Sequence, residues 1–461
     1  MSSPDLLRWL GAAAAVAAYA ALCAVIWWRE RRRAAAAAAD AASLAGPDAA
    51  AAASTLVLHA SQTGQAEELA WQTARWLHAG GRPVRVLALN ALDAATLAAA
   101  PQAFFIASTY GEGDAPDGAS VFVDQVMGAA PRSLAALRYA LLALGDRQYE
   151  QFCGFGRRLD AWLQGLGAQP LFERIEADNL APAALADWRR RLRPEADDGT
   201  QAGDDDAPAD FASWRLVSRT LLNPGSQGGP VFELGFMPPR GPDPHWEPGD
   251  LAQIRLDGDP ARPRDYSIAS TVRDGELQLI VRQERHPDGR LGAASGLLTA
   301  TLALGDAVAL RLRRHRSFRL EGNAHRPLIL IGNGTGLAGL RAHLRERAAT
   351  GAGPNWLVFG ERQAAHDFLC RDELSAWQAS GVLARLDMVF SRDQPERRYV
   401  QHQLLRAADE LQAWLHRDAA IYVCGSLQGM AAGVDAALRQ IAGEAAVHEL
   451  QRTGRYRRDV Y

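Results

Sequence analysis

Three polar loops in the first half of the chain contain groups that could hold a phosphate and a flat ring. SQTGQAEELA, from Ser61 to Ala70, offers hydroxyls, a glycine and main-chain N–H groups before an expected helix, so it could bind a phosphate with help from the helix dipole. The same letters are also an ordinary helix-capping signal. Loops 108–119 and 145–156 each carry one tyrosine, Tyr110 and Tyr149, and together the two could sandwich a ring. Singly, such tyrosines are more often surface or core residues.

Two segments in the middle of the chain could bind a diphosphate and a second ring. RDYSIAS, residues 264–270, places Arg, Tyr and Ser along an expected strand, where they could pair with a diphosphate, stack on a ring and donate a hydrogen bond. An ordinary half-exposed strand shows the same alternation. GRLGAAS, residues 289–295, offers small residues and N–H groups before a helical LLTATLAL, which suits a pyrophosphate.

The last third of the chain contains two patterns that could indicate dinucleotide binding, a glycine-rich turn and an arginine-rich segment. The second is the stronger evidence. PLILIGNGTGLAGL places a glycine-rich turn between a strand and a helix, which alone is weak evidence. In SRDQPERRYVQ, Ser391, Arg392 and Arg397 follow another expected strand and provide a hydroxyl and positive charge suited to a 2′-phosphate. The commoner explanation of such a run is a solvated charged surface.

The C-terminal region adds a cysteine, a carboxylate and an aromatic residue. Cys424 lies at the end of the expected strand AIYVCG, and the sequence finishes RYRRDVY. A buried cysteine is usually core packing, and Asp459 would usually be a surface charge. The terminal aromatic residue, Tyr461, is suggestive of a functional position.

The expected elements that position these loops fall into three groups. Apolar strands alternate with amphipathic helices in residues 55–194, which predicts a doubly wound parallel sheet. Six strand patterns separated by Gly and Pro turns predict an antiparallel barrel over 211–326. Strand and helix patterns alternate again over 327–461, which predicts a second parallel sheet. An acidic, Gly- and Ala-rich segment at 195–210 is the expected linker.

The composition excludes several classes of function. The chain of 461 residues has a net charge of −3, and all 50 of its basic residues are arginine, so nothing favours nucleic acid binding. Its four cysteines form no CxxC pair and no metal-like spacing, and we therefore expect no metal site and a reducing compartment.

The N-terminal segment predicts a membrane anchor. The uncharged run 9–28 is long enough to cross a bilayer as a helix, with tryptophans at both ends and an arginine cluster directly after it. That order predicts a single-pass transmembrane helix, a tether over 29–54 and cytoplasmic catalytic domains. A cleaved signal peptide would carry its basic residues before the apolar run, and a peripheral helix remains a third option because the run is rich in alanine.

SQTG, STYGEGDAPD and ALGDRQYEQFCGFG, in this order and spacing, resemble the FMN-binding loops of the flavodoxin-like domain of NADPH-dependent diflavin reductases, a family that includes sulfite reductase flavoproteins. The resemblance implies that Tyr110 and Tyr149 flank the isoalloxazine. It implies a phosphate loop of Ser61, Gln62, Thr63, Gly64, Gln65 and Ala66. It adds to the FMN site Ser108, Thr109, Gly111, Gly113, Leu144, Gly145, Asp146 and Phe152. Asp146 stands where many relatives carry asparagine.

The middle and last segments are similar to a ferredoxin-NADP reductase-like module, with an FAD-binding barrel and an NADP-binding sheet. The resemblance implies FAD contacts by Arg264, Tyr266, Ser267, Gly292, Ala293, Ala294 and Ser295. It implies NADPH contacts by Gly334, Thr335, Gly336, Ser391, Arg392, Arg397, Tyr399 and Gln401. Relatives usually have proline at positions 333 and 339, where this chain has asparagine and glycine.

The resemblance also implies a mechanism and a difference from the full-length relatives. Ser267, Cys424 and Asp459 match the polar groups that assist hydride transfer, and Tyr461 covers the FAD ring and must move before nicotinamide can stack there. The expected function is electron transfer from NADPH through FAD and FMN to a one-electron acceptor, a haem protein or similar partner. Alternatives are a membrane reductase of ferric chelates or quinones, or a non-catalytic flavin-binding sensor or scaffold. The large helical connecting domain of the relatives is missing between WEPGDLAQIRL and RDYSIAS.

Overall fold

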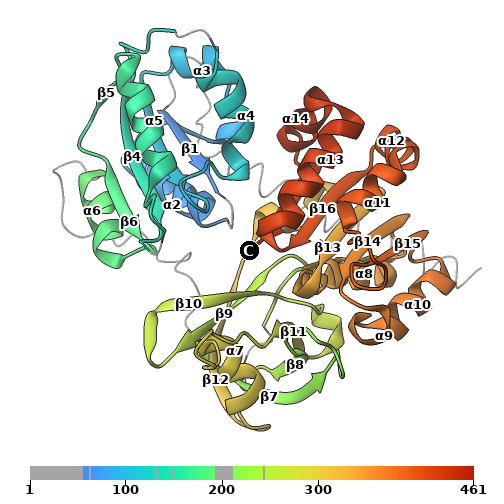
Figure 1. Cartoon of the computed structure of the whole chain (residues 1–461). Helices are drawn as coiled ribbons and strands as arrows, with labels where there is room; N and C mark the ends of the chain where they lie inside the picture. The colour runs from blue at the N-terminus through green and yellow to red at the C-terminus, as the bar shows by residue number, and fades with distance from the viewer. Residues whose placement is uncertain (1–54, 62–63, 130–131, 148, 193–210, 242–243) are drawn as a thin grey trace, which may run out of the picture.

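The computed structural model describes residues 55–61, 64–129, 132–147, 149–192, 211–241 and 244–461. Two parallel sheets and one antiparallel barrel meet around the C-terminus (Figure 1). The expected anchor at 9–28, the tether at 29–54 and the linker at 195–210 lie outside the described residues. Within the described part, every helix is too short or too polar to cross a bilayer.

The first domain is a six-stranded parallel sheet with helices on both faces. Its strand order is β2-β1-β3-β4-β5, with β6 also paired to β4. The central strands are continuous apolar runs because both of their faces are buried. The strands are β1 (Thr55–Ala60), β2 (Val84–Ala88), β3 (Gln102–Ser108), β4 (Arg138–Gly145), β5 (Gln169–Pro170) and β6 (Ile175–Asp178). This confirms the doubly wound sheet and adds β5 and β6, which the apolar pattern did not predict.

Two hydrophobic cores fill the space between this sheet and its helices. One face packs on α2 (Gln65–Ala79) and α6 (Pro182–Leu192). The other packs on α3 (Ala94–Ala99), α4 (Ser120–Phe122) and α5 (Gly154–Gly165). Buried residues three or four apart on α2, such as Leu69, Thr73 and Leu77, form its inward-facing stripe.

The barrel contains the six strands that the sequence predicts, in the order β10-β9-β12-β7-β8-β11 with antiparallel pairing. A single bridge between Ile268 and Leu279 joins the two ends of this path. The strands are β7 (Ala212–Leu221), β8 (Val231–Met237), β9 (Leu251–Leu256), β10 (Asp259–Ser267), β11 (Leu277–Arg282) and β12 (Ala307–Arg313). Only Asp257 and Gly258 separate β9 from β10, so a tight hairpin joins these two strands.

The last domain is a five-stranded parallel sheet of order β15-β14-β13-β16-β17. Its strands are β13 (Leu328–Asn333), β14 (Asn355–Glu361), β15 (Arg385–Phe390), β16 (Ala420–Gly425) and β17 (Tyr456–Val460). Apolar runs in the sequence predict the first four, whereas β17 reads YRRDV and lacks an apolar run. Its backbone is nevertheless paired in register with β16.

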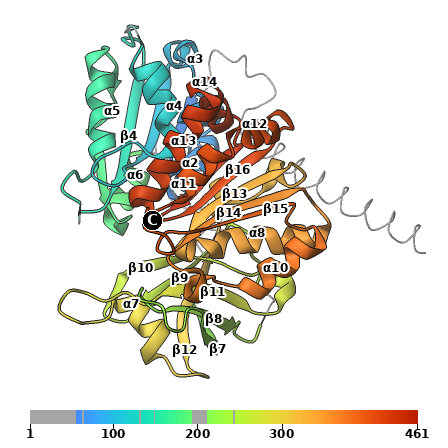
Figure 2. The ribbon, with the colours of Figure 1, turned by 45° about the vertical axis from the view of Figure 1, so that its right-hand side comes forward.

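Helices cover both faces of this last sheet, and Figure 2 shows one of them, α8, between the sheet and the barrel. The residues of α8 (Leu337–Thr350) are buried almost all round, because the helix packs on two layers at once. The remaining helices are α9 (Ala364–Asp367), α10 (Arg371–Ser380), α11 (Val400–Arg406), α12 (Ala408–His416), α13 (Ala432–Ala442) and α14 (Glu444–Arg452).

Candidate flavin and nucleotide sites

The predicted phosphate loop has the geometry of a helix N-terminus. The Ser61 Oγ accepts a hydrogen bond from the Ala66 N–H at 3.3 Å, and Gly64 adopts the left-handed conformation at φ 83° before α2 begins at Gln65. The N–H groups of the first helical turn therefore point out of the helix, where an anion could accept from them. Gln62 and Thr63 lie outside the described residues.

The two tyrosine loops meet at the carboxyl edge of the same sheet. A Cβ on Gly154 would lie 2.8 Å from the Gly113 Cα, so the loops are in contact through their glycines. Tyr110 pairs with Asp114 across a narrow turn, with N–H to O distances of 2.8 and 2.9 Å. Tyr149 is 46% exposed and Tyr110 is half-buried, so the two rings differ in how much of each a cofactor could cover.

Buried polar groups at this edge suit a ring with hydrogen-bonding atoms. The Thr109 Oγ1 and the Tyr110 hydroxyl are buried and have no hydrogen-bond partner within the described part of the chain. Because such groups are costly to leave unsatisfied, they fit a site that FMN completes. Burial raises the pKa of Tyr110 to about 12, which keeps its hydroxyl protonated.

The other predicted FMN residues occupy strand ends. Ser108 ends β3, and Leu144 and Gly145 end β4. Gly145 has no room for a side chain, because a Cβ there would lie 2.8 Å from the Cys153 nitrogen. Phe152 packs into a small core with Ala143 and Cys153, and Gly111 adopts a positive φ of 49° beside Tyr110. Asp146 follows β4 directly.

The predicted FAD residues lie on β10 and on a short helix. Tyr266 packs against the barrel core, and burial raises its pKa to about 12. The Arg264 guanidinium bonds to the Arg262 carbonyl and lies 3.4 Å from the Asp259 carboxylate, so in this structure it contacts its own hairpin. The sequence analysis expects Arg264 to contact a diphosphate, and that contact would require this side chain to turn.

The helix after GRLG is short and irregular. The pattern predicts a helix over LLTATLAL, but an α-helical turn covers Ala293–Gly296 and a π-helical turn covers Leu297–Thr301. The Ser295 Oγ accepts from the Glu284 N–H at 3.1 Å. Gly292 precedes Ala293 and Ala294 and leaves little space, since a Cβ there would lie 2.8 Å from the Ser295 Oγ.

Three residues from three strands converge at the proposed hydride-transfer site. The Ser267 hydroxyl, at the end of β10, donates to the Asp459 Oδ2 at 2.7 Å. The Cys424 Sγ on β16 donates to the same oxygen at 3.7 Å, because Cys424 and Asp459 are register partners. Burial, together with the Asp459 charge, holds the pKa of the Cys424 thiol well above its ordinary value. The thiol is therefore a protonated donor at neutral pH.

The glycine-rich turn and the C-terminal residue lie beside these three groups. A Cβ on Gly336 would stand 2.1 Å from the Cys424 carbonyl oxygen, so only glycine allows this close approach. The Thr335 hydroxyl and the Tyr461 hydroxyl are 3.0 Å apart. Gly334 has a φ of 57°.

The two departures from the family's proline pattern have structural explanations. The Asn333 Oδ1 accepts from the Ser426 N–H at 2.9 Å, which ties the glycine-rich turn to the end of β16. Gly339 faces the Phe318 ring and the Cys424 sulfur, and a Cβ there would lie 3.0 Å from Phe318. Position 339 therefore depends on close packing around Cys424, and position 333 on the hydrogen bond to Ser426.

The predicted 2′-phosphate residues follow β15 and begin α11. The Ser391 N–H donates to the Glu361 carbonyl at 2.9 Å, and the Arg392 N–H donates to the Arg362 carbonyl at 2.8 Å. Arg397 is exposed and Tyr399 is 40% exposed. The Gln401 Oε1 is buried and lacks a hydrogen-bond partner among the described residues. Ser391 itself is buried, so its hydroxyl is less accessible than the sequence analysis implies.

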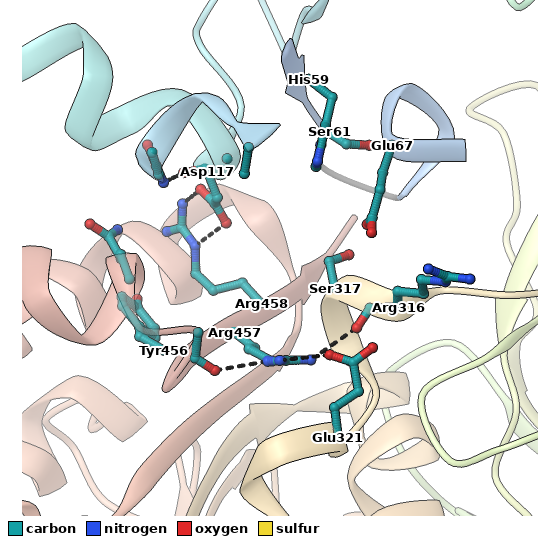
Figure 3. A pocket seen from close by; sticks show the side chains of 15 residues that line it. His59, Ser61, Glu67, Asp117, Arg316, Ser317, Glu321, Tyr456, Arg457 and Arg458 are labelled. Carbon is teal, nitrogen blue, oxygen red and sulfur yellow. Dashed lines mark hydrogen bonds and ion pairs between the residues drawn. The ribbon is translucent and has the colours of Figure 1, made fainter. Parts of the chain in front are cut away.

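A cavity of 310 Å³ lies where the first domain meets β17 and the segment 316–321 that follows the barrel strands. Figure 3 shows His59, Ser61 and Glu67 on its upper side and Arg316, Glu321 and Arg457 on its lower side. Burial lowers the pKa of His59 to about 4 and raises that of Glu67. Its walls come from residues that are hundreds of positions apart, so no local sequence pattern predicts this cavity.

The fold and these sites define a class of protein, a flavin-dependent reductase whose electron-donor module and flavodoxin-type domain share one chain. Residues 57–190 match the Flavodoxin family, and residues 330–436 match the Oxidoreductase NAD-binding domain family. The chain is 30% identical to the sulfite reductase (NADPH) flavoprotein alpha-component of Vibrio cholerae, over 88% of this chain and 87% of the relative. The Bacillus subtilis and Neisseria meningitidis proteins of the same name are 27% and 29% identical, each over 88% of this chain and 89% of the relative.

The chain belongs to the family of sulfite reductase (NADPH) flavoprotein alpha-components. It is an NADPH-dependent diflavin oxidoreductase with FMN, FAD and NADPH as cofactors, which confirms the predicted enzyme class. The alignment with the Vibrio cholerae relative spans 534 residues, more than the 461 of this chain. The relative therefore contains segments without a counterpart here, in agreement with the tight β9–β10 hairpin.

Proposed function

We propose that this enzyme passes electrons from NADPH through FAD and FMN to a separate haem protein. The relatives are named alpha-components of sulfite reductase, which supports a partner component as acceptor. The observation that carries the proposal is that Ser267, Cys424 and Asp459 share one hydrogen-bonded cluster close to the surface on which the FMN domain packs. NADPH supplies a hydride, and two flavins in series divide its two electrons into single-electron steps.

We assign the polar cluster a role in orienting and protonating the reacting groups. Asp459 is the shared acceptor, and it holds the Ser267 hydroxyl at 2.7 Å and the Cys424 thiol at 3.7 Å. Because the Asp459 carboxylate is fixed, the Ser267 hydroxyl and the Cys424 thiol are each held in one orientation. Groups that are preorganised in this way do not have to rearrange during the reaction. Asp459 is only 6% exposed to solvent, so bulk water competes little for these hydrogen bonds.

Tyr461 is proposed to be a movable cover over the FAD ring. Its main chain is anchored, because its N–H donates to the Gly425 carbonyl at 3.1 Å and its carbonyl accepts from the Leu427 N–H at 3.0 Å. The whole residue is 56% exposed, and its hydroxyl bonds to Thr335. A net contribution of about 1 kcal/mol for one such hydrogen bond is easily overcome by an entering nicotinamide. The side chain can therefore rotate while the backbone stays in place.

We propose that Ser391, Arg392, Arg397, Tyr399 and Gln401 form the 2′-phosphate site. The two arginines supply the charge for the phosphate, whereas the buried Gln401 oxygen can only accept a hydrogen bond and therefore suits a donor group of the nucleotide. The proposed domain limits are 55–194 for FMN, 211–326 for FAD and 327–461 for NADP, with 195–210 as the linker. The helix α6 ends at Leu192 and β7 begins at Ala212, in keeping with these limits. The anchor at 9–28 stays a prediction.

The experiment uses the full-length purified protein with both flavins. NADPH is expected to bleach the flavin absorbance, and the reduced protein is expected to reduce cytochrome c, a one-electron haem acceptor. A panel of haem proteins, ferric chelates and quinones then identifies the acceptor class. Faster reduction of quinones or ferric chelates than of every haem protein would overturn the haem assignment, and binding of a single flavin would remove the proposed relay.

A further inference from the structure

Strand β17 connects the hydride-transfer cluster to the FMN domain. Successive side chains of a strand point to opposite faces. Asp459 points to Ser267 and Cys424, whereas its neighbour Arg458 points the other way and forms an ion pair with Asp117 of the FMN domain (Figure 3). One strand therefore carries both a residue of the chemical site and a contact with the second domain.

The FMN domain holds Asp117 in place from its own side. The Asp117 carbonyl accepts from the Asn90 Nδ2 at 2.6 Å and from the Ser120 hydroxyl at 3.1 Å. The Asn90 Oδ1 also accepts from the Val121 N–H at 2.9 Å, which fixes the turn that follows. Asp117 belongs to the same loop as Tyr110, residues 108–119. The position of the Asp117 carboxylate is therefore tied to the position of this loop.

The ion pair is shielded from water. The Arg458 and Asp117 side chains are 16% and 24% exposed, and two guanidinium nitrogens face the two carboxylate oxygens. Such a bidentate arrangement fixes orientation as well as distance. Burial lowers the pKa of Arg458 to about 10, and the nearby Tyr110 hydroxyl acts in the opposite sense. The guanidinium remains charged at neutral pH.

We propose that Arg458 is a positioning residue through which docking of the FMN domain sets Asp459 and Tyr461 for hydride transfer. When Asp117 is docked, Arg458 holds β17 against β16, and the two following residues keep their places beside Cys424 and Gly425. When the FMN domain moves away, the Arg458 charge loses its partner and β17 loosens. Hydride transfer to FAD is then fastest in the docked arrangement. This inference rests on the proposed role of Asp459.

The test compares Asp117→Asn with Asp124→Asn in the holoenzyme. Both changes remove a carboxylate charge from the FMN domain at the same interface. Asp124 lies 3.2 Å from the His448 Nε2 on α14, whereas Asp117 contacts β17, so the second variant is a matched control. We expect NADPH-driven flavin reduction to slow about fivefold in Asp117→Asn, with an unchanged apparent affinity for NADPH, and to change less than about twofold in Asp124→Asn.

Hydrogen exchange gives a readout that is independent of activity. Amides of residues 456–461 are expected to exchange faster in Asp117→Asn than in the wild type or in Asp124→Asn. The Arg458→Gln variant should show the same two effects, and the double variant should be no slower than the slower single variant, because both remove one interaction.

Several outcomes would overturn the inference. If Asp117→Asn transfers hydride at the wild-type rate, docking does not act through β17, even if Arg458→Gln is slow. Equal slowing in Asp117→Asn and Asp124→Asn would assign the effect to docking in general. If Asp459→Asn also has the wild-type rate, the failure lies in the proposed role of Asp459 and not in the coupling alone.

Discussion

Asp459→Asn is expected to slow NADPH-dependent flavin reduction about 10- to 100-fold. The substitution keeps the shape of the side chain but removes the charge that holds the Ser267 hydroxyl at 2.7 Å and the Cys424 thiol at 3.7 Å. Hydrogen bonds to a charged group contribute about 1.5–3 kcal/mol. Each increase of about 1.4 kcal/mol in the activation barrier slows the reaction about tenfold. If that stabilisation is present mainly in the transition state, the loss falls on the rate and not on NADPH affinity.

The assay is anaerobic stopped-flow absorbance of the holoenzyme mixed with excess NADPH. Asp387→Asn is the control, because Asp387 also accepts hydrogen bonds, from the Trp356 Nε1 and the Arg385 Nε at 2.7 Å each, but lies on β15. We expect both variants to retain both flavins. A rate for Asp459→Asn within twofold of the wild type, or no lower than that of Asp387→Asn, would refute the reasoning.

Three further results are expected. Arg392→Gln should weaken NADPH binding about tenfold and leave NADH binding unchanged, measured as the ratio of kcat/KM for the two nucleotides, because a phosphate contact with a charged group is lost. Gly336→Ala should lower NADPH turnover and the thermal midpoint, since its Cβ would stand 2.1 Å from the Cys424 oxygen, whereas Gly322→Ala, with open space around it, should do neither. Burial lowers the pKa of His343 to about 3, so the contribution of its neutral ring to the free energy of unfolding is full above the ordinary pKa near 6.5 and falls by about 1.4 kcal/mol per pH unit below it. Burial also lowers the pKa values of His59 and His315, so His343→Phe should make the fall in urea midpoints between pH 7 and pH 5 shallower without abolishing it, and an equal slope in both proteins would contradict this expectation.

Local patterns in the sequence were sufficient for most of the sheet and barrel elements. Apolar runs such as AFFIA and LILIG form buried parallel strands because their own composition requires burial on both faces. The loops that follow these strands are placed at one edge by the parallel topology, so Ser61, Tyr110 and Gly334 could be proposed as site residues from position alone. The family resemblance then assigned the cofactors, and the comparisons confirmed them.

Features that depend on long-range contacts were decided by the tertiary structure. Strand β17 has three charged residues between Tyr456 and Val460 and is paired in register with β16, so no apolar run marks it in the sequence. The short β5 and β6 likewise depend on β4 for their pairing. The Arg264 side chain turns to its own hairpin, a rotamer choice that motif matching does not contain.

One physical cause separates the features that the sequence determines from those that only the tertiary structure decides. Burial and turn preferences are properties of neighbouring residues, and they can be read from the order of amino acids. The meeting of Arg458 with Asp117, and of Ser267 with Asp459, joins residues that the chain separates by 341 and 192 positions. Such contacts exist only once three folded domains pack together, because only packing brings those side chains within hydrogen-bonding distance.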